Sequence, residues 1–147
     1  MKIRFAVTVA WLGCATPAFS APQHVDLSKL PAPVRTTIES ETKNATVKHV
    51  AKETEKGQVQ YEVETLVNGK SRDLLIDPSG KLLEVEEAMD VNSAPAPVQD
   101  ALKAKGKVLK LESVLRDGKT TYEAEVQGKN GKKSSVALDA QGKPPSR

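Results

Sequence analysis

The chain has 147 residues, with 22 Lys and Arg against 19 Asp and Glu, a formal net charge of +3 and 3% aromatic residues. Binding to nucleic acid needs clustered positive charge and usually aromatic side chains that stack on bases, and this composition favours neither. After residue 20 there is no cysteine and no apolar run near 20 residues, so we expect no disulfide and no transmembrane segment.

Residues 1–20 have the pattern of a secretory signal peptide. A positive region with Lys2 and Arg4 precedes an apolar stretch that ends at Cys14 and is too short to span a bilayer, and small residues precede Ala21. The alternative is a bacterial lipoprotein modified at Cys14, whose attachment pattern the preceding residues match only in part. We therefore expect a periplasmic or secreted protein in preference to a lipoprotein.

The rest of the chain consists of two similar halves. Segments 30–35 and 56–64 of the first half match 94–99 and 117–125 of the second. A period of about 60 residues is too long for a solenoid repeat and fits a small duplicated domain.

In chain order, each half opens with a predicted amphipathic helix. In the first half, Leu30, Val34 and Ile38 are spaced four residues apart and form one apolar stripe. Prolines lie in the first turn, where a missing N–H has no helical partner to lose. The second half repeats the pattern around Val98, and Gly106 is the predicted end of its helix.

Alternating apolar and polar residues then predict strands. In the first half the predicted strands are 47–52, 59–64, 72–76 and 81–86. In the second half they are 108–115, 121–126 and 134–138. Asn-Gly pairs at 68–69 and 130–131 predict tight hairpins, because both residues tolerate a positive φ. The alternation indicates antiparallel strands with one face buried and one face wet.

The expected fold is α+β, with two tandem repeats, each an N-terminal helix packed on a three- to four-stranded antiparallel sheet. The repeats are placed at 21–87 and 88–147. The second is expected to lack the fourth strand, because Pro144 and Pro145 stand where that strand would begin. The sheet edge at Leu138 would then pair with the first repeat, with a partner strand or with a second copy.

The segments 58–64, 68–70 and 75–85 resemble a PepSY domain, with its Tyr-Glu-Val-Glu strand and its Asp-x-x-Gly-Lys hairpin. The two-copy, exported arrangement resembles the PepSY-like proteins grouped with the β-lactamase inhibitor protein. This resemblance implies small secreted or periplasmic modules, some of them in protease propeptides and proposed to inhibit peptidases. It implies no catalytic residues.

Catalysis and metal binding have few candidate residues. His24 lies in a segment expected to be mobile, and His49 corresponds to Lys110 in the second half, which favours a solvated strand position over a catalytic base. Two distant histidines without cysteine do not make a standard zinc site. We therefore expect no enzyme activity, no metal site and no cofactor.

Acidic and aromatic residues of the strands have simple structural interpretations. An acidic run at 84–90 offers oxygen ligands for weak calcium binding, but its alternation along a strand favours a solvated face. Tyr61 and Tyr122 occupy equivalent positions in alternating strands, and we expect both to be core anchors.

We expect a non-enzymatic protein-interaction module that contacts its partner through polar strand faces. The predicted contact residues are Gln60, Glu62, Glu64, Thr121, Glu123 and Glu125. The partner implied by the resemblance is an envelope or secreted protein, such as a protease or another hydrolase that the module modulates or inhibits. The alternative is a periplasmic protein that binds divalent cations or a small ligand weakly. The expected state is a monomer or an edge-strand homodimer.

Overall fold

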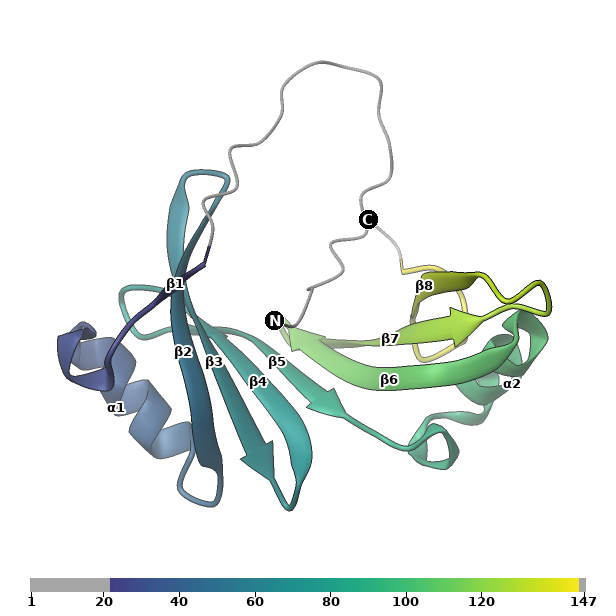
Figure 1. Ribbon diagram of the computed structural model, residues 1–147, viewed down its shortest axis with the longest axis horizontal. Helices are drawn as coiled ribbons and strands as arrows, with labels where there is room; N and C mark the ends of the chain where they lie inside the picture. The colour runs from purple at the N-terminus through teal and green to yellow at the C-terminus, as the bar shows by residue number, and fades with distance from the viewer. Residues whose placement is uncertain (1–21, 146–147) are drawn as a thin grey trace. The chain divides into compact units, whose positions relative to one another are not determined.

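The computed structural model describes residues 22–145, so the predicted signal peptide, with Cys14, lies outside the described residues. The described strands form one eight-stranded sheet in the order β1-β2-β3-β4-β5-β6-β7-β8. Figure 1 labels the strands and the two α-helices. The elements are β1 (Gln23–His24), the 3-10 turn η1 (Leu27–Lys29), α1 (Ala32–Glu41), β2 (Thr46–Glu55), β3 (Gln58–Val67), β4 (Lys70–Ile76), β5 (Leu82–Ala88), the 3-10 turn η2 (Val91–Ser93), α2 (Ala96–Lys105), β6 (Lys107–Arg116), β7 (Lys119–Gln127) and β8 (Lys133–Leu138).

The predicted fold class of two tandem helix-plus-sheet repeats with three to four strands each is wrong. The strands follow one another in a single eight-stranded sheet that carries two helices among the described residues. Side-chain periodicity identifies each strand but not its neighbours, because the hydrogen bonds that extend a sheet come from the backbone. Strand β1 was not predicted at all, since two residues are too few to show an alternation.

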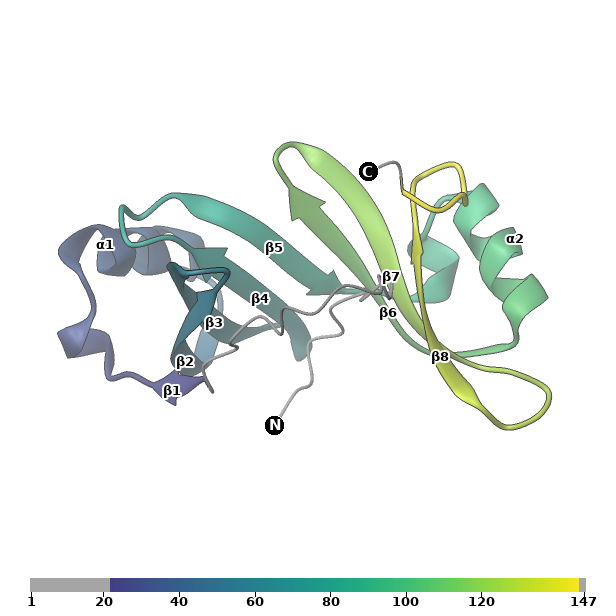
Figure 2. The same cartoon turned by 90° about the horizontal axis from the view of Figure 1, so that it is seen from above.

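The described residues divide into two compact units. The first unit comprises residues 22–88 together with 115–119, and the second comprises 89–114 and 120–145. In Figure 2, α1 is seen beside the strands of the first unit and α2 beside those of the second.

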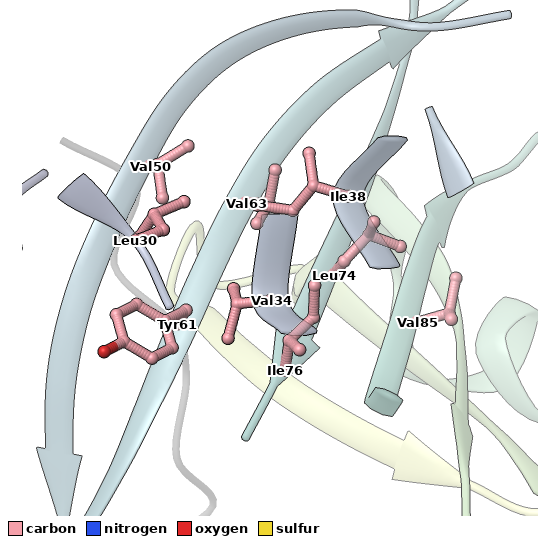
Figure 3. Packing of buried hydrophobic residues seen from close by; sticks show 9 residues of the cluster. All are labelled: Leu30, Val34, Ile38, Val50, Tyr61, Val63, Leu74, Ile76 and Val85. Carbon is pink, nitrogen blue, oxygen red and sulfur yellow. The ribbon is translucent and has the colours of Figure 1, made fainter. Parts of the chain in front are cut away.

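The core of the first unit is formed where α1 covers the sheet. Val34 and Ile38 of α1 are buried together with Leu30, which precedes the helix; these are the residues predicted to form the apolar stripe. Figure 3 shows these side chains against those of the strands. The strand residues of this cluster are Val50, Tyr61, Val63, Leu74, Ile76 and Val85. Full burial of such a side chain contributes about 1.5–3 kcal/mol, so this cluster is the main source of the unit's stability.

An arginine holds the C-terminal end of α1. Arg72 of β4 donates from Nη2 to Glu41 Oε2 at 2.9 Å, from Nη1 to the Glu41 carbonyl oxygen at 3.1 Å, and from Nε to Glu87 Oε1 at 2.9 Å. A cation is favourable at a helix C-terminus, where carbonyl groups lack intrahelical partners. Arg72 therefore connects α1, β4 and β5.

The N-terminal part of α1 is held by the turn between β4 and β5. Asp77 Oδ1 accepts hydrogen bonds from the backbone N–H groups of Ser79 and Lys81, at 2.8 and 2.9 Å. Gly80 has a φ of +88°, and a Cβ there would lie 2.7 Å from the Pro33 carbonyl oxygen. Thr37 Oγ1 donates to the Gly80 carbonyl oxygen at 2.6 Å. This turn therefore needs glycine both for its backbone conformation and for its close contact with the helix.

The second unit repeats this construction with less burial. Its core contains Ala94, Val98, Leu102, Leu111, Ala124, Val126 and Leu138. Helix α2 ends at Lys105 with Gly106 as its cap, which confirms the predicted end. Tyr61 is buried as predicted, whereas Tyr122 is only half-buried, as is Val136 of β8.

Candidate interaction surface

The candidate interaction surface lies on the face of the first unit's sheet that points away from α1, which we call the helix-free face. Successive side chains of a strand point to opposite faces, so the burial of Tyr61 and Val63 against α1 directs Gln60, Glu62 and Glu64 to the helix-free face. These three are the predicted contact residues of the first half. Their use in binding stays a prediction.

The strand register brings further carboxylates to this face. Glu62 lies opposite Ala51 of β2 and Leu75 of β4. Glu64 lies opposite His49 and Asp73. Continuing across the sheet, Glu84 lies opposite Leu75 and Glu86 opposite Asp73. Acidic residues from three neighbouring strands therefore share one face, although they are up to 24 positions apart in the chain.

This face is less exposed than the sequence pattern predicted. Gln60 is 7% exposed, Asp73 8% and Glu84 3%, and Glu62 and Glu64 are half-buried. The interpretation of the 84–90 run as a solvated face is wrong for Glu84. Its physical reason is a long-range ion pair: Arg116 Nε donates to Glu84 Oε2 at 2.5 Å, and Arg116 Nη2 contacts the same oxygen.

Shorter-range contacts fix the other polar side chains. Both Asp73 carboxylate oxygens accept from Ser71 Oγ at 3.1 Å. Gln60 Nε2 lies 3.5 Å from Glu55 Oε2. A buried carboxylate needs such partners, because leaving water costs free energy that hydrogen bonds must offset. The fold thus holds the two buried carboxylates of this face, Asp73 and Glu84, in place.

The corresponding face of the second unit has a different charge pattern. Thr121, Glu123 and Glu125, the other predicted contact residues, alternate with the core residues Ala124 and Val126 of β7. Two lysines form ion pairs among this unit's acidic residues. Lys133 Nζ lies 2.8 Å from Glu125 Oε1, and Lys110 Nζ lies 2.6 Å from Glu112 Oε2. The predicted role of Thr121, Glu123 and Glu125 in binding also stays a prediction.

The two histidines occupy positions that the sequence did not suggest. His24 was expected in a mobile segment, but it belongs to β1 and lies opposite Ala51 of β2. Its Nδ1 is 3.1 Å from His49 Nδ1, and the ring centroids are 4.8 Å apart. No local signal could have revealed this contact, because the two residues are 25 positions apart.

A shallow pocket of about 310 Å³ lies at the end of α1. It is lined by residues that include Ser40, Glu41, Arg72 and Glu87. The ion pairs of Arg72 with Glu41 and Glu87 run through it, so its polar groups serve the fold. Among residues 22–145, no group of three or more His, Cys, Asp or Glu side chains lies close enough together to hold a metal ion. In the same range, no helix is long and apolar enough to cross a membrane.

No protein-family model and no curated protein matches this sequence. Solved structures do match. A protein of Bacteroides eggerthii described as periplasmic has 17% identity and a TM-score of 0.64 over 78% of this chain and 84% of its own. A DUF2874 family protein of Bacteroides uniformis has 18% identity and a TM-score of 0.62, over 77% and 84%.

A BLIP-like protein of Bacteroides fragilis, named for its likeness to the β-lactamase inhibitor protein, has 18% identity and a TM-score of 0.59, over 77% of this chain and 81% of its own. Likeness at this level of identity shows the fold alone. The chain therefore has a BLIP-like fold, which confirms that part of the resemblance seen in the sequence. Its membership of the PepSY family stays a prediction.

Proposed function

We propose that this chain is an exported, non-enzymatic protein-interaction module that acts in the periplasm or outside the cell, and that it modulates a hydrolase or protease there. The observation that carries the proposal is the helix-free face of the first unit, where the half-buried carboxylates Glu62, Glu64 and Glu86 lie around the buried Asp73 and Glu84. A structured sheet face of this kind is suited to bind another protein.

The structural neighbours support the same class. One is described as periplasmic and another as BLIP-like, and this chain shares their fold. The leader-like pattern of residues 1–20 independently supports export. The sequence contains no motif for nucleophilic catalysis that would favour an enzyme instead.

The charge of the helix-free face defines the partner's chemistry. Carboxylates in this density attract a segment rich in lysine or arginine, and such attraction accelerates association and weakens as salt rises. Binding hot spots are rich in Trp, Tyr and Arg. The chain has no Trp beyond residue 20, and Tyr61 is buried in the core. We therefore propose micromolar affinity that depends on salt, in contrast to a tight inhibitor interface.

The test uses the protein without its leader as bait for periplasmic extract, followed by titration against each captured protein and against exported proteases and β-lactamases. The variant Glu62→Gln/Glu64→Gln removes two charges from the helix-free face. Glu39→Gln is the matched control, because Glu39 is exposed on α1. We expect the double variant to weaken binding about tenfold and the control to leave it unchanged. Nanomolar inhibition that is insensitive to salt would contradict the proposal.

Calcium distinguishes the alternative function. A ligand that binds only the folded state raises the midpoint of thermal unfolding. A higher Tm in millimolar calcium would favour weak cation binding as the protein's role. An unchanged Tm together with a captured partner would favour the interaction module.

A further inference from the structure

The only two histidines of the chain lie in contact. His24 and His49 belong to the neighbouring strands β1 and β2, and their rings are inclined by 21°. Val25 and Val50 pack in the core of the first unit, so strand alternation directs both histidines to the helix-free face. Backbone pairing of β1 with β2, including the hydrogen bond from Val25 N–H to the Val50 carbonyl oxygen at 3.0 Å, holds the two rings together.

The separation of 3.1 Å between the two Nδ1 atoms has two chemical uses. In the neutral pair, one Nδ1–H donates to the lone pair of the other Nδ1. The same separation suits two nitrogen ligands of one metal ion, because ligands about 2.0–2.1 Å from the ion at angles near 90–109° lie roughly 2.9–3.4 Å apart. Because the rings are stacked, both must rotate about χ2 for their Nδ1 lone pairs to converge on one ion, and the Nδ1 proton then moves to Nε2 of its ring.

The surroundings of the pair favour a cation. Asp26 Oδ1 lies 4.0 Å from His24 Nε2, close enough for electrostatic attraction to a cation bound by the ring but too far for a hydrogen bond. Glu64 lies opposite His49 across β2 and β3. Lys29 Nζ also lies 3.6 Å from the Asp26 carboxylate and shares its charge. Asp26 thus lies on the Nε2 side of His24, and Glu64 is the strand neighbour of His49, so both carboxylates add negative charge near the pair.

We propose that His24 and His49 form a two-histidine site for a divalent transition-metal ion that prefers nitrogen, with water completing the coordination. Imidazole suits Cu²⁺, Ni²⁺ and Zn²⁺, and Cu²⁺ binds more tightly than Zn²⁺ to a given set of ligands. The site differs in chemistry from calcium binding, which requires oxygen ligands. Because one ligand comes from each strand, the ion would fasten β1 to β2.

The test is calorimetric titration of the tag-free full chain with Ni²⁺ and Cu²⁺, compared with His24→Gln, His49→Gln and the double variant, which contains no histidine. We expect one ion per chain, and at least tenfold weaker binding when either histidine is replaced, because two tethered ligands bind cooperatively. Lys48→Gln is the matched control, since Lys48 is exposed beside His49; it should leave the affinity unchanged.

Electron paramagnetic resonance of the Cu²⁺ form gives a second readout, in which two nitrogen ligands are expected for the unaltered chain and fewer for each single variant. Circular dichroism checks that the variants remain folded. Equal affinity in the unaltered chain and in His49→Gln would overturn the proposal, because His24 would then suffice. Equal affinity in the double variant would overturn it as well, since the ion would bind elsewhere.

Discussion

The first and second units share their helix starts and aspartate turns but differ in how deeply their core side chains are buried. Both have a helix that begins after Pro31 or Pro95, and both have an aspartate turn that packs on that helix. In the first unit Leu74 is 1% exposed beside Val85, whereas the corresponding Val136 of the second unit is half-buried. Turns and helix starts are thus retained more strictly than the depth of the core.

The outward faces differ in a second way. On the helix-free face of the first unit Glu84 pairs with an arginine, Arg116, whereas in the second unit Glu112 and Glu125 pair with the lysines Lys110 and Lys133. A scaffold can tolerate such divergence because surface charges contribute little to its stability.

The largest expected effect tests the difference in burial. Leu74→Ala removes a fully buried side chain from the first core, and we expect a loss of about 3 kcal/mol in the free energy of unfolding. Val136→Ala at the corresponding position should cost only about 1 kcal/mol, because that side chain is half-buried and smaller. Denaturation in urea measures both losses. Equal losses would show that the two cores are packed equally well.

The next effect tests the helix-packed turn. Gly80→Ala requires a positive φ for alanine and places its Cβ against the Pro33 carbonyl oxygen, so we expect a loss of about 2–3 kcal/mol. Gly142→Ala should be similarly costly, since its Cβ would meet the Pro97 carbonyl oxygen. Thermal unfolding of both variants measures the effect.

Gly57→Ala is the control for the glycine variants. Gly57 has a φ of +81° but no atom within 4 Å of the added Cβ. We expect a loss of only about 1 kcal/mol, because the backbone cost remains and the collision is absent. A loss as large as that of Gly80→Ala would mean that contact with the helix is unimportant.

A smaller effect tests the ion pair of the buried carboxylate. Arg116→Ala removes a partner of Glu84, which is 3% exposed, and we expect a loss of about 1–2 kcal/mol because a buried carboxylate is left with fewer contacts. Lys119→Ala, an exposed residue of the same hairpin, should change stability little. If the two variants lose equal stability, the ion pair contributes nothing measurable.

The smallest effect concerns pH. A hydrogen bond from Ser79 Oγ is the largest cause that holds the pKa of Asp77 below its ordinary value. Because the folded state favours the charged carboxylate, its stabilising contribution is present above the ordinary pKa of an aspartate and is lost as pH falls through the lowered folded pKa. Ser79→Ala should therefore raise the pKa of Asp77, as measured by NMR titration.

The second turn provides a natural comparison for Ser79, because Gln141 stands at the corresponding position and Asp139 Oδ1 accepts only backbone hydrogen bonds among those seen there. Ser93→Ala, in the exposed turn η2, is the control that should leave the pKa of Asp77 unchanged. An unchanged Asp77 pKa in Ser79→Ala would show that the backbone N–H groups are sufficient.

Local features of the fold could be predicted from the sequence, whereas long-range pairings could not. Helix α2 ends at Lys105 with Gly106 as its cap, and the predicted hairpin forms at Asn68-Gly69, because these features depend on neighbouring residues. The single sheet, strand β1 and the burial of Glu84 were missed. Each depends on a contact made far along the chain, such as the one between Glu84 and Arg116, which are 32 positions apart.

The same limit applies to the candidate surface. The alternation of apolar and polar residues along β3 correctly predicted that Gln60, Glu62 and Glu64 point away from the core, because strand periodicity alone decides this. The neighbours of these residues, Asp73 and Glu86, could be recognised only once the register across β3, β4 and β5 was known. The contact between the histidines required the position of β1, for which the sequence contains no periodic signal.

Residues 115–119, the tip of the hairpin between β6 and β7, belong to the first unit, where Arg116 binds Glu84. A fragment that ends at Ala88 would therefore lose part of its own structure. The first unit is discontinuous in sequence, so its fold is complete only when residues up to 119 are present.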